Sequence, residues 1–306
     1  MTTDFPKTKV VGFPLFDKVT LLDFAGATQI FADAEGFTPV WLAPEMRPYQ
    51  TSEKTVNITE KKEEEEQQQP ICIQPQFTFS DPNRPRIDIL FCPGGASGSY
   101  DDNSGEGNGF IGAMFDETYQ DFVTEVANEE AYCYGSVCTG AFVLAAAGLF
   151  DGYTATTYWS VIEELRRFPN ITVPEGYPRV LINTEVGGEK KVCFSGGGVS
   201  SSLDLALALV NHLSNDDPLV AQKAQLKSQY APKPIINFGD PSEASQGMVE
   251  ESEFVKDVRQ SQNSGFIYPT QCAVTKILNQ GEVSKKRRGR NNKQTRGRGD
   301  AGTRRR

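Results

Sequence analysis

Cys138 lies in a run of mostly small residues, GSVCTGA at positions 135–141, and is a candidate nucleophile. An apolar run at 131–134 precedes these residues, and an Ala-rich, helix-like run at 142–147 follows them. A strand, a tight turn and a helix in that order place Cys138 on the turn, where the unpaired N–H groups of the helix converge on its sulfur. Such donors and the helix dipole lower the pKa of a thiol and favour the nucleophilic thiolate. The alternative is a buried cysteine with a purely structural role.

Asp23 is a second candidate. It lies near the start of a segment with helical spacing of apolar residues, 21–34, which follows a strand-like run at 9–16. An Asp at such a junction can cap the helix, because its carboxylate accepts backbone N–H groups. From its position alone, helix capping is the leading interpretation of this residue.

Gly94 and Gly95 follow the continuous apolar run IDILFC at 87–92, which is typical of a strand inside a parallel sheet. Glycines at the C-terminal end of such a strand let backbone N–H groups approach a ligand closely, although they also suit a plain turn. The letters of a dinucleotide-binding fingerprint recur at 107–112, but they follow a polar loop and not a strand, so we reject that interpretation.

Strand-like and helix-like segments alternate along the chain and must position these candidates. Further strands are expected at 37–43, 155–158, 180–184 and 191–194, and further helices at 110–128, 159–168, 203–213 and 222–230. The alternation predicts an α/β fold, a three-layer sandwich with a mostly parallel central sheet of the flavodoxin-like kind, with Cys138 on a nucleophile elbow. Because ligands gather at the carboxyl ends of parallel strands, Cys138 and Asp23 should meet there.

Charge and cysteine usage narrow the class of protein. The 306 residues carry a net charge of −9, with eleven Lys and Arg against two acidic residues in 281–306, so the body is strongly acidic and repels nucleic acid. The six cysteines show no C-x-x-C spacing, so we expect neither disulfides nor structural zinc, and no metal or organic cofactor. His212, the only histidine, should be a structural residue near a helix end. No apolar stretch suggests a leader or a membrane span, and we expect a cytoplasmic protein.

The chain divides into three parts by composition. Residues 1–247 form the expected catalytic domain, and the charged run at 60–69 within them is an insertion. Residues 248–280 are a polar extension, with apolar residues enough for one small element at 265–278. Residues 281–306 are a basic tail without an apolar stripe, which should be disordered. Three interpretations stay open: a solvated extension without function, a patch for nuclear import or weak nucleic-acid binding, and docking on the acidic body.

Five blocks together resemble the ThiJ/PfpI branch of the class I glutamine-amidotransferase-like superfamily, and within it the isonitrile hydratases. The blocks are VGFPLFDKVTLLDFAGATQIF, IDILFCPGG, GSVCTGAFVLAAAGLFDGYTATTYW, FSGGGVSSSLDLALALV and QYAPKPIINFGDP, and they span about residues 8–245. PGG and the elbow cysteine are shared across the superfamily, whereas LLDFAG, SVCTG and QYAP favour the hydratase branch. The resemblance implies a small-molecule substrate and a homodimer.

The resemblance also implies roles for particular residues. Cys138 would be the nucleophile, with Thr139 beside it in the site and Asp23 as the acid/base carboxylate. The backbone N–H groups of Gly95 and Thr139 would form an anion hole beside Gly94. Relatives commonly have His where this chain has Tyr158, so Tyr158 should line the pocket while a Cys–Asp pair performs the chemistry.

The implied reaction is the hydration of an isonitrile to an N-substituted formamide. Cys138 would attack the terminal carbon, and Asp23 would supply and remove protons. An ionised Asp23 next to the sulfur raises the pKa of the thiol, so we expect the pair to share a proton and the pKa of Asp23 to be raised too. Two alternatives stay open: another cysteine-dependent hydrolase or glyoxalase-type enzyme, and a noncatalytic redox sensor or binding protein.

Overall fold

A seven-stranded sheet is the centre of the computed structural model, which describes residues 8–56, 68–101, 103–184, 191–214, 217–244 and 273–279. The strand order is β10-β11-β9-β6-β1-β2-β5. The strands are β1 (Lys9–Pro14), β2 (Phe37–Ala43), β5 (Phe77–Thr78), β6 (Ile89–Cys92), β9 (Cys133–Val137), β10 (Val180–Asn183) and β11 (Val192–Gly196). Neighbouring strands pair in parallel except β10 and β11, which are antiparallel. The expected mostly parallel sheet is confirmed.

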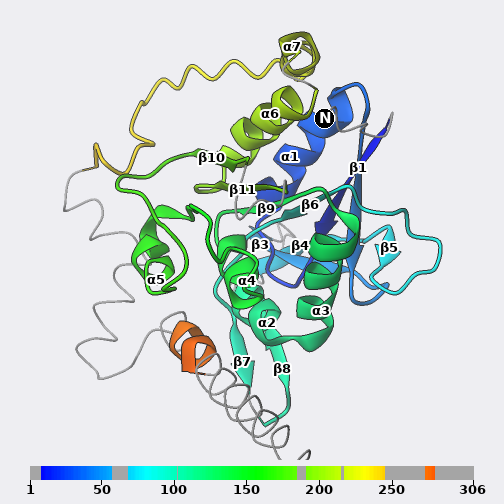
Figure 1. Ribbon diagram of the computed structural model, residues 1–306, viewed down its shortest axis with the longest axis vertical. Coiled ribbons are helices and arrows are strands. Elements are labelled where there is room, and N and C mark those ends of the chain that lie inside the picture. Colours follow the sequence, from blue (N-terminus) through cyan, green and yellow to red (C-terminus); the bar gives the residue numbers. More distant parts are fainter. Residues whose placement is uncertain are drawn as a thin grey trace, which may run out of the picture.

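Helices cover both faces of the sheet and complete three layers (Figure 1). The helices are α1 (Leu21–Asp33), α2 (Gly109–Phe115), α3 (Glu117–Glu125), α4 (Gly140–Ala146), α5 (Ile162–Leu165), α6 (Ser201–Leu213) and α7 (Pro218–Lys227), with a π-helical turn at Val126–Glu130 and a 3₁₀ turn at Trp159–Val161. α1 packs against α6 and α7 on one face, and α2 packs against α3 and α4 on the other. This is the flavodoxin-like sandwich that the alternation of segments predicts.

Two hairpins and a short helix lie outside the sheet. The hairpins are β3 (Tyr49–Val56) with β4 (Gln68–Ile73), and β7 (Ser99–Asp101) with β8 (Glu106–Asn108). The helix, 273–279, overlaps the C-terminal half of the small element expected at 265–278. Its Lys276 ammonium lies 4.8 Å from the ring centre of Tyr100 and 4.4 Å from that of Phe115, and Thr275 accepts a hydrogen bond from Arg167. The extension therefore returns to the body at this helix.

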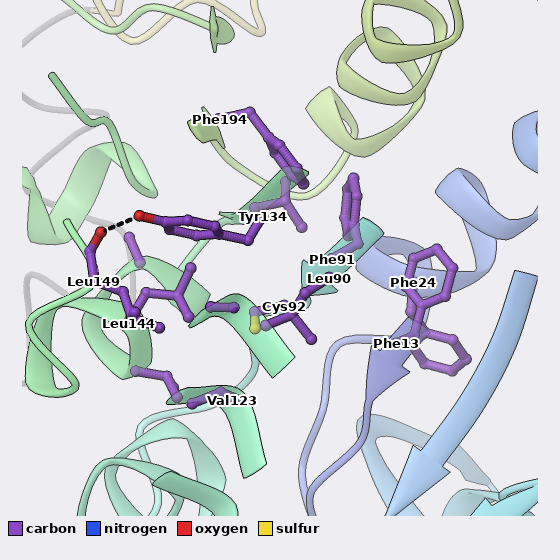
Figure 2. Packing of buried hydrophobic residues seen from close by; sticks show 14 of the residues in the cluster. Phe13, Phe24, Leu90, Phe91, Cys92, Val123, Tyr134, Leu144, Leu149 and Phe194 are labelled. Carbon is purple, nitrogen blue, oxygen red and sulfur yellow. Dashed lines mark hydrogen bonds between the residues drawn. The ribbon is translucent and has the colours of Figure 1, made fainter. Parts of the chain in front are cut away.

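Aromatic side chains tie the central strands together under the site (Figure 2). The ring of Phe91 in β6 lies 5.2 Å from that of Phe13 in β1 and 5.4 Å from that of Phe194 in β11. All three side chains are fully buried, and each contributes about 1.5–3 kcal/mol by leaving water. The hydroxyl of Tyr134 in β9 donates to the carbonyl of Leu149, 3.0 Å away, and so anchors the segment after α4. This packing fixes the strand ends from which the candidate residues emerge.

Three expected elements differ from the structure. The helix expected at 110–128 is interrupted at Asp116, whose extended backbone ends α2 and whose side chain caps α3 by accepting the N–H of Tyr119. The segment expected as a strand at 155–158 forms no regular strand: the Thr156 N–H donates to the side-chain hydroxyl of Ser195 in β11, and the Thr157 hydroxyl donates to the Cys138 carbonyl. The helix expected at 159–168 is short, and consists of the 3₁₀ turn followed by α5.

Several expectations concern segments outside the described residues. These are most of the charged insertion 60–69, the extension 248–280 apart from its helix 273–279, and the whole basic tail 281–306. The boundary of the catalytic domain at residue 247 also lies there.

Candidate active site

Cys138 occupies a sharp turn between β9 and α4. Its φ is 56°, in the left-handed region that residues with a side chain seldom adopt, which is where a nucleophile elbow places its central residue. The cysteine N–H donates to the carbonyl oxygens of Gly197 at 2.8 Å and Gly196 at 3.2 Å. Its own carbonyl accepts the hydroxyl of Thr157 at 2.7 Å. These bonds stabilise a strained backbone on both sides of the sulfur.

Gly94 lies against the elbow so closely that only glycine fits. A Cβ atom at this position would lie 2.5 Å from the Thr139 nitrogen and 2.8 Å from the Cβ of Cys138. The loop after β6 therefore contacts the loop after β9 through bare backbone. Gly94 was expected to bring its N–H group close to a ligand, but this N–H donates to the Asp23 carboxylate instead.

Asp23 is fully buried in the first turn of α1, yet its side chain does not cap that helix. Its Oδ2 accepts the N–H of Gly94 at 2.9 Å, and its Oδ1 has no nitrogen or oxygen partner among the described residues. The helix N-terminus is bonded elsewhere, because the N–H of Leu21 donates to the Glu53 carboxylate at 3.1 and 3.3 Å. The capping interpretation of Asp23 is therefore wrong, and its carboxyl is left for the site.

Burial controls the protonation of both groups. It raises the pKa of Asp23 to about 8. The hydrogen bond from the Gly94 N–H lowers this pKa, and the negative charge of Glu53 raises it further. Burial, and then the neighbouring Asp23 carboxyl, raise the pKa of the Cys138 thiol well above its usual range. The expectation that helix donors would lower the thiol pKa is wrong: the Thr139 N–H does act in that direction, but desolvation is larger. At pH 7 the resting pair is therefore a neutral acid beside a neutral thiol.

The acid proton can be assigned to one oxygen. Because the Gly94 N–H donates to Oδ2, that oxygen serves as the acceptor, and the proton of the neutral acid resides on Oδ1. Oδ1 has no nitrogen or oxygen partner among the described residues, whereas the side chains of Asp23 and Cys138 interact with each other. Asp23 thus presents its proton to the sulfur.

The expected anion hole is only partly present. The N–H of Gly95 donates to the hydroxyl oxygen of Thr139 at 2.9 Å, and that hydroxyl donates in turn to the Gly95 carbonyl at 2.9 Å. The Gly95 N–H is thus already engaged, so the expectation that it stands ready for an anion is wrong here. Thr139 clamps the two loops with its hydroxyl, while its backbone N–H hydrogen-bonds to the Cys138 sulfur.

Tyr158 reaches the site from the irregular segment before α5. Its ring covers Gly198, where a Cβ would come within 2.8 Å of it, and its hydroxyl is near enough to Cys138 for the two groups to interact electrostatically. Burial and that interaction raise the pKa of the half-buried phenol above its ordinary value. Tyr158 therefore stays protonated at neutral pH and can donate a hydrogen bond, but it cannot act as a base.

Tyr158→Phe should consequently reduce turnover by less than about tenfold, because the ring stays in place and a single neutral hydrogen bond is lost. Steady-state rates of wild type and variant at pH 7 measure this. A loss as large as that caused by removing the Cys138 sulfur would mean that the phenol has taken over the role of an imidazole base.

Sequence reasoning missed the residues that support the elbow from other strands. The hydroxyl of Ser195 in β11 accepts the N–H of Thr156 at 2.9 Å, and so holds the segment that carries Thr157 and Tyr158. The only signals were the run TTYW at 156–159 and the glycine-rich run SGGG at 195–198, and neither run specifies a hydrogen-bond partner. Glu53 gave no signal at all, since it lies in a polar stretch with no recognisable motif.

No group of three or more His, Cys, Asp or Glu that could hold a metal occurs among residues the structure describes. His212 belongs to the last turn of α6, away from the pair, as expected of a structural histidine. In the part of the chain that the structure describes, no helix is long and apolar enough to cross a membrane.

Known proteins share both the sequence pattern and the fold. The chain is 31% identical over 242 residues to the isonitrile hydratase of Pseudomonas putida, an alignment that covers 79% of this chain and 87% of that protein. A ThiJ/PfpI family protein of Pseudomonas syringae has the same fold, with a TM-score of 0.66, 24% identity and coverage of 89% and 93% of the two chains. DJ-1beta of Drosophila melanogaster superposes with a TM-score of 0.53 at 14% identity, over 74% of this chain and all of that one. The DJ-1/PfpI family model matches residues 9–209, and the chain belongs to the DJ-1/PfpI family.

Proposed function

We propose that this protein is an isonitrile hydratase-like enzyme that adds water to R–N≡C and releases the formamide R–NH–CHO. The observation that carries the proposal is the buried pair of Cys138 and a protonated Asp23, whose side chains interact directly, with no nitrogen or oxygen partner at Oδ1 among the described residues. An isonitrile needs a nucleophile and a proton at the same terminal carbon, and this pair offers both from one place. The identity to the Pseudomonas putida enzyme supports the same reaction.

The first step forms a covalent intermediate. Oδ1–H of Asp23 protonates the terminal carbon while the Cys138 sulfur attacks it, and the thiol proton passes to Oδ1 as the C–S bond forms. The product is the thioimidate R–N=CH–S–Cys138, and Asp23 is again protonated. Because the pKa of the Cys138 thiol is raised, the thiol is neutral at rest. In this scheme it becomes nucleophilic as its proton moves to the Asp23 carboxyl during the attack.

Water completes the reaction at the same carbon. Oδ1–H protonates the nitrogen while Oδ1 accepts a proton from the attacking water, giving R–NH–CH(OH)–S–Cys138. The C–S bond then breaks, and the hydroxyl proton passes through the carboxyl to the sulfur, which releases R–NH–CHO and the free thiol. The Thr139 hydroxyl keeps the two loops together throughout, because its bonds to Gly95 do not involve the reacting atoms.

Product analysis tests the proposal. Wild type is incubated with a panel of alkyl and aryl isonitriles, methylglyoxal and simple amides, and products are identified by mass spectrometry. Formamide formation from an isonitrile, absent with Cys138→Ala, is the expected result. Turnover of methylglyoxal or an amide in place of isonitriles would assign another cysteine-dependent reaction, and reversible peroxide modification without any turnover would assign a redox sensor.

Removal of the basic tail should leave this activity unchanged. Truncation after residue 280 removes only residues 281–306 and retains helix 273–279, which packs against Tyr100 and Phe115. We expect equal kcat/KM and equal melting temperature. Truncation after residue 244 is the matched control, and should lower the melting temperature because it uncovers the surface under that helix. Loss of turnover at unchanged stability in the 280 variant would place the tail over the site.

A further inference from the structure

The hairpin formed by β3 and β4 is bonded to the loop that leads into α1. Val19 in that loop bridges to Thr51 on one side and to Gly95 on the other. The N–H of Ser52 donates to the Val19 carbonyl at 2.9 Å, and the N–H of Lys18 donates to the Gln50 carbonyl at 2.7 Å. The loop is thus held between the hairpin and the glycine turn of the site.

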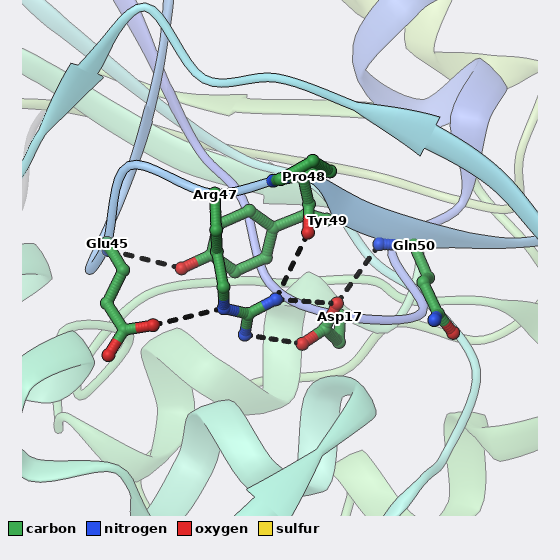
Figure 3. Close-up of polar contacts among 6 residues, drawn as sticks. All are labelled: Asp17, Glu45, Arg47, Pro48, Tyr49 and Gln50. Carbon is green, nitrogen blue, oxygen red and sulfur yellow. Dashed lines mark hydrogen bonds and ion pairs between the residues drawn. The ribbon is translucent and has the colours of Figure 1, made fainter.

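An ion-pair cluster fixes the base of this hairpin (Figure 3). Arg47 contacts Asp17 at 2.6 Å and Glu45 at 3.0 Å, and its guanidinium lies 4.1 Å from the ring centre of Tyr49. Asp17 also accepts the N–H of Gln50 at 3.0 Å. These contacts set where the following residues of β3 lie relative to α1.

Glu53 uses that placement to cap α1 from a different element. Both of its carboxylate oxygens lie within 3.3 Å of the Leu21 N–H, and Ser52 donates to Oε1 at 3.1 Å. The helix's own N-cap residue, Thr20, makes no side-chain capping bond. A negative charge at a helix N-terminus is favourable, so Glu53 stabilises the first turn, which carries Asp23.

The same carboxylate also acts on Asp23 through its charge. Three groups act on the Asp23 carboxyl: the Gly94 N–H and the Cys138 thiol favour its ionised form, and Glu53 opposes ionisation. Glu53 is the only like charge among them, and it lies on a hairpin outside the central sheet.

We propose that Glu53 is a positioning residue for the Cys138–Asp23 pair: it caps the N-terminus of α1 two residues before Asp23, and its negative charge adds to the effect of burial on the Asp23 carboxyl. The inference rests on the proposed role of Asp23 as proton donor. The effect of Glu53 on the ionisation of Asp23 can nevertheless be measured without any substrate.

The test compares Glu53→Gln with wild type. The carboxamide oxygen can still accept the Leu21 N–H, but the charge is gone, so ionisation of Asp23 should begin at lower pH. The readout is the infrared band of the protonated carboxyl, identified as the band that Asp23→Asn removes, followed from pH 6 to 10. We expect the midpoint of its loss near pH 8 in wild type, and lower by about half a pH unit or more in Glu53→Gln.

Two variants separate charge from capping. Glu35→Gln removes an exposed carboxylate just after α1, outside the Arg47 cluster, and should leave the midpoint unchanged. Glu53→Asp keeps the charge but shortens the reach to Leu21, so it should lower the melting temperature by a few degrees and leave the midpoint close to that of wild type. The alkaline limb of the hydration rate, measured in parallel, should move with the midpoint in each variant.

The outcomes distinguish the two proposals. An unchanged infrared midpoint in Glu53→Gln, or an equal shift in Glu53→Asp and Glu53→Gln, would reduce Glu53 to a helix cap and overturn this inference. Should Glu53→Gln fail to fold, the infrared midpoints of Glu53→Asp and Glu53→Ala are compared instead. An influence of the charge predicts a lower midpoint in Glu53→Ala than in Glu53→Asp, whereas a helix cap without electrostatic influence predicts the same midpoint in both. A shifted midpoint in a protein that hydrates no isonitrile would support Glu53's influence on the pair and refute the proposed reaction alone.

Discussion

Cys138→Ala and Cys138→Ser should abolish the proposed formamide production, with turnover reduced by at least about a thousandfold, while the fold persists. The sulfur forms the covalent bond in the proposed reaction, and a serine hydroxyl is too poor a nucleophile to replace it. Both replacements are no larger than cysteine, so the close contact between the Cβ and Gly94 is preserved. Steady-state assay and near-ultraviolet circular dichroism of the two variants measure the effect.

A matched control is Cys92→Ala, which removes a buried thiol at the end of β6, outside the pair. It should lower stability by about 1–3 kcal/mol through lost packing but retain turnover at full folding. Retention of more than a few per cent of the rate by Cys138→Ala would contradict the covalent mechanism.

Asp23→Asn should remove at least about a hundredfold of the rate and, unusually for a buried substitution, increase stability at alkaline pH. The amide oxygen can still accept the Gly94 N–H, but no acid proton remains. In wild type the folded pKa of about 8 lies above that of an unfolded Asp, near 3.9. Between these values the unfolded chain binds fewer protons than the native one, so the free energy of unfolding falls as pH rises.

The size of that effect follows from the same linkage. The carboxyl costs wild type on the order of 5 kcal/mol at pH 8 and above, relative to pH below 4, and Asn has no such dependence. Urea unfolding at pH 5 and pH 8.5 should therefore show a gap between variant and wild type that widens with pH. A variant that is less stable than wild type by the same amount at both pH values would indicate a purely structural Asp23, and one that retains activity would rule out the proton-transfer role.

Thiol labelling must account for a second cysteine. Cys72 is exposed, whereas Cys138 is buried with a raised pKa, so an alkylating agent at pH 7 should modify Cys72 first. A Cys72→Ser background makes labelling of Cys138 measurable. In that background Asp23→Asn should still be alkylated at Cys138, because the substitution leaves the sulfur in place.

The layers and the elbow were predictable because each depends on local sequence, and the Cys–Asp pairing was predictable because the carboxyl ends of parallel strands meet at one edge of a sheet. The small residues around Cys138 specify a turn, and the order of strands in a parallel sheet brings Asp23 to the same edge. The position of Glu53 depends on a separate hairpin and on the Arg47 cluster at its base, so no local pattern marks it. Its part in the site could be found only after folding.

Two errors of the sequence interpretation have one physical origin, which is competition between local and tertiary effects. The donors of α4 do act on the Cys138 sulfur, but burial overrides them and raises its pKa. The segment 155–158 has β-branched residues suited to a strand, yet Thr156 bonds to the Ser195 side chain and Thr157 to the Cys138 carbonyl, and no strand ladder forms. In both places the tertiary environment of the site overrides the local preference.

The covalent thioimidate is the central claim, and rapid-quench mass spectrometry tests it most directly. Wild type in a Cys72→Ser background is mixed with excess isonitrile, quenched with acid from milliseconds to minutes, and its peptides are weighed. The account predicts that the peptide carrying Cys138 gains the mass of one isonitrile before formamide accumulates, and that Cys138→Ala gains none. Release of formamide while that peptide stays unmodified at every quench time would contradict it.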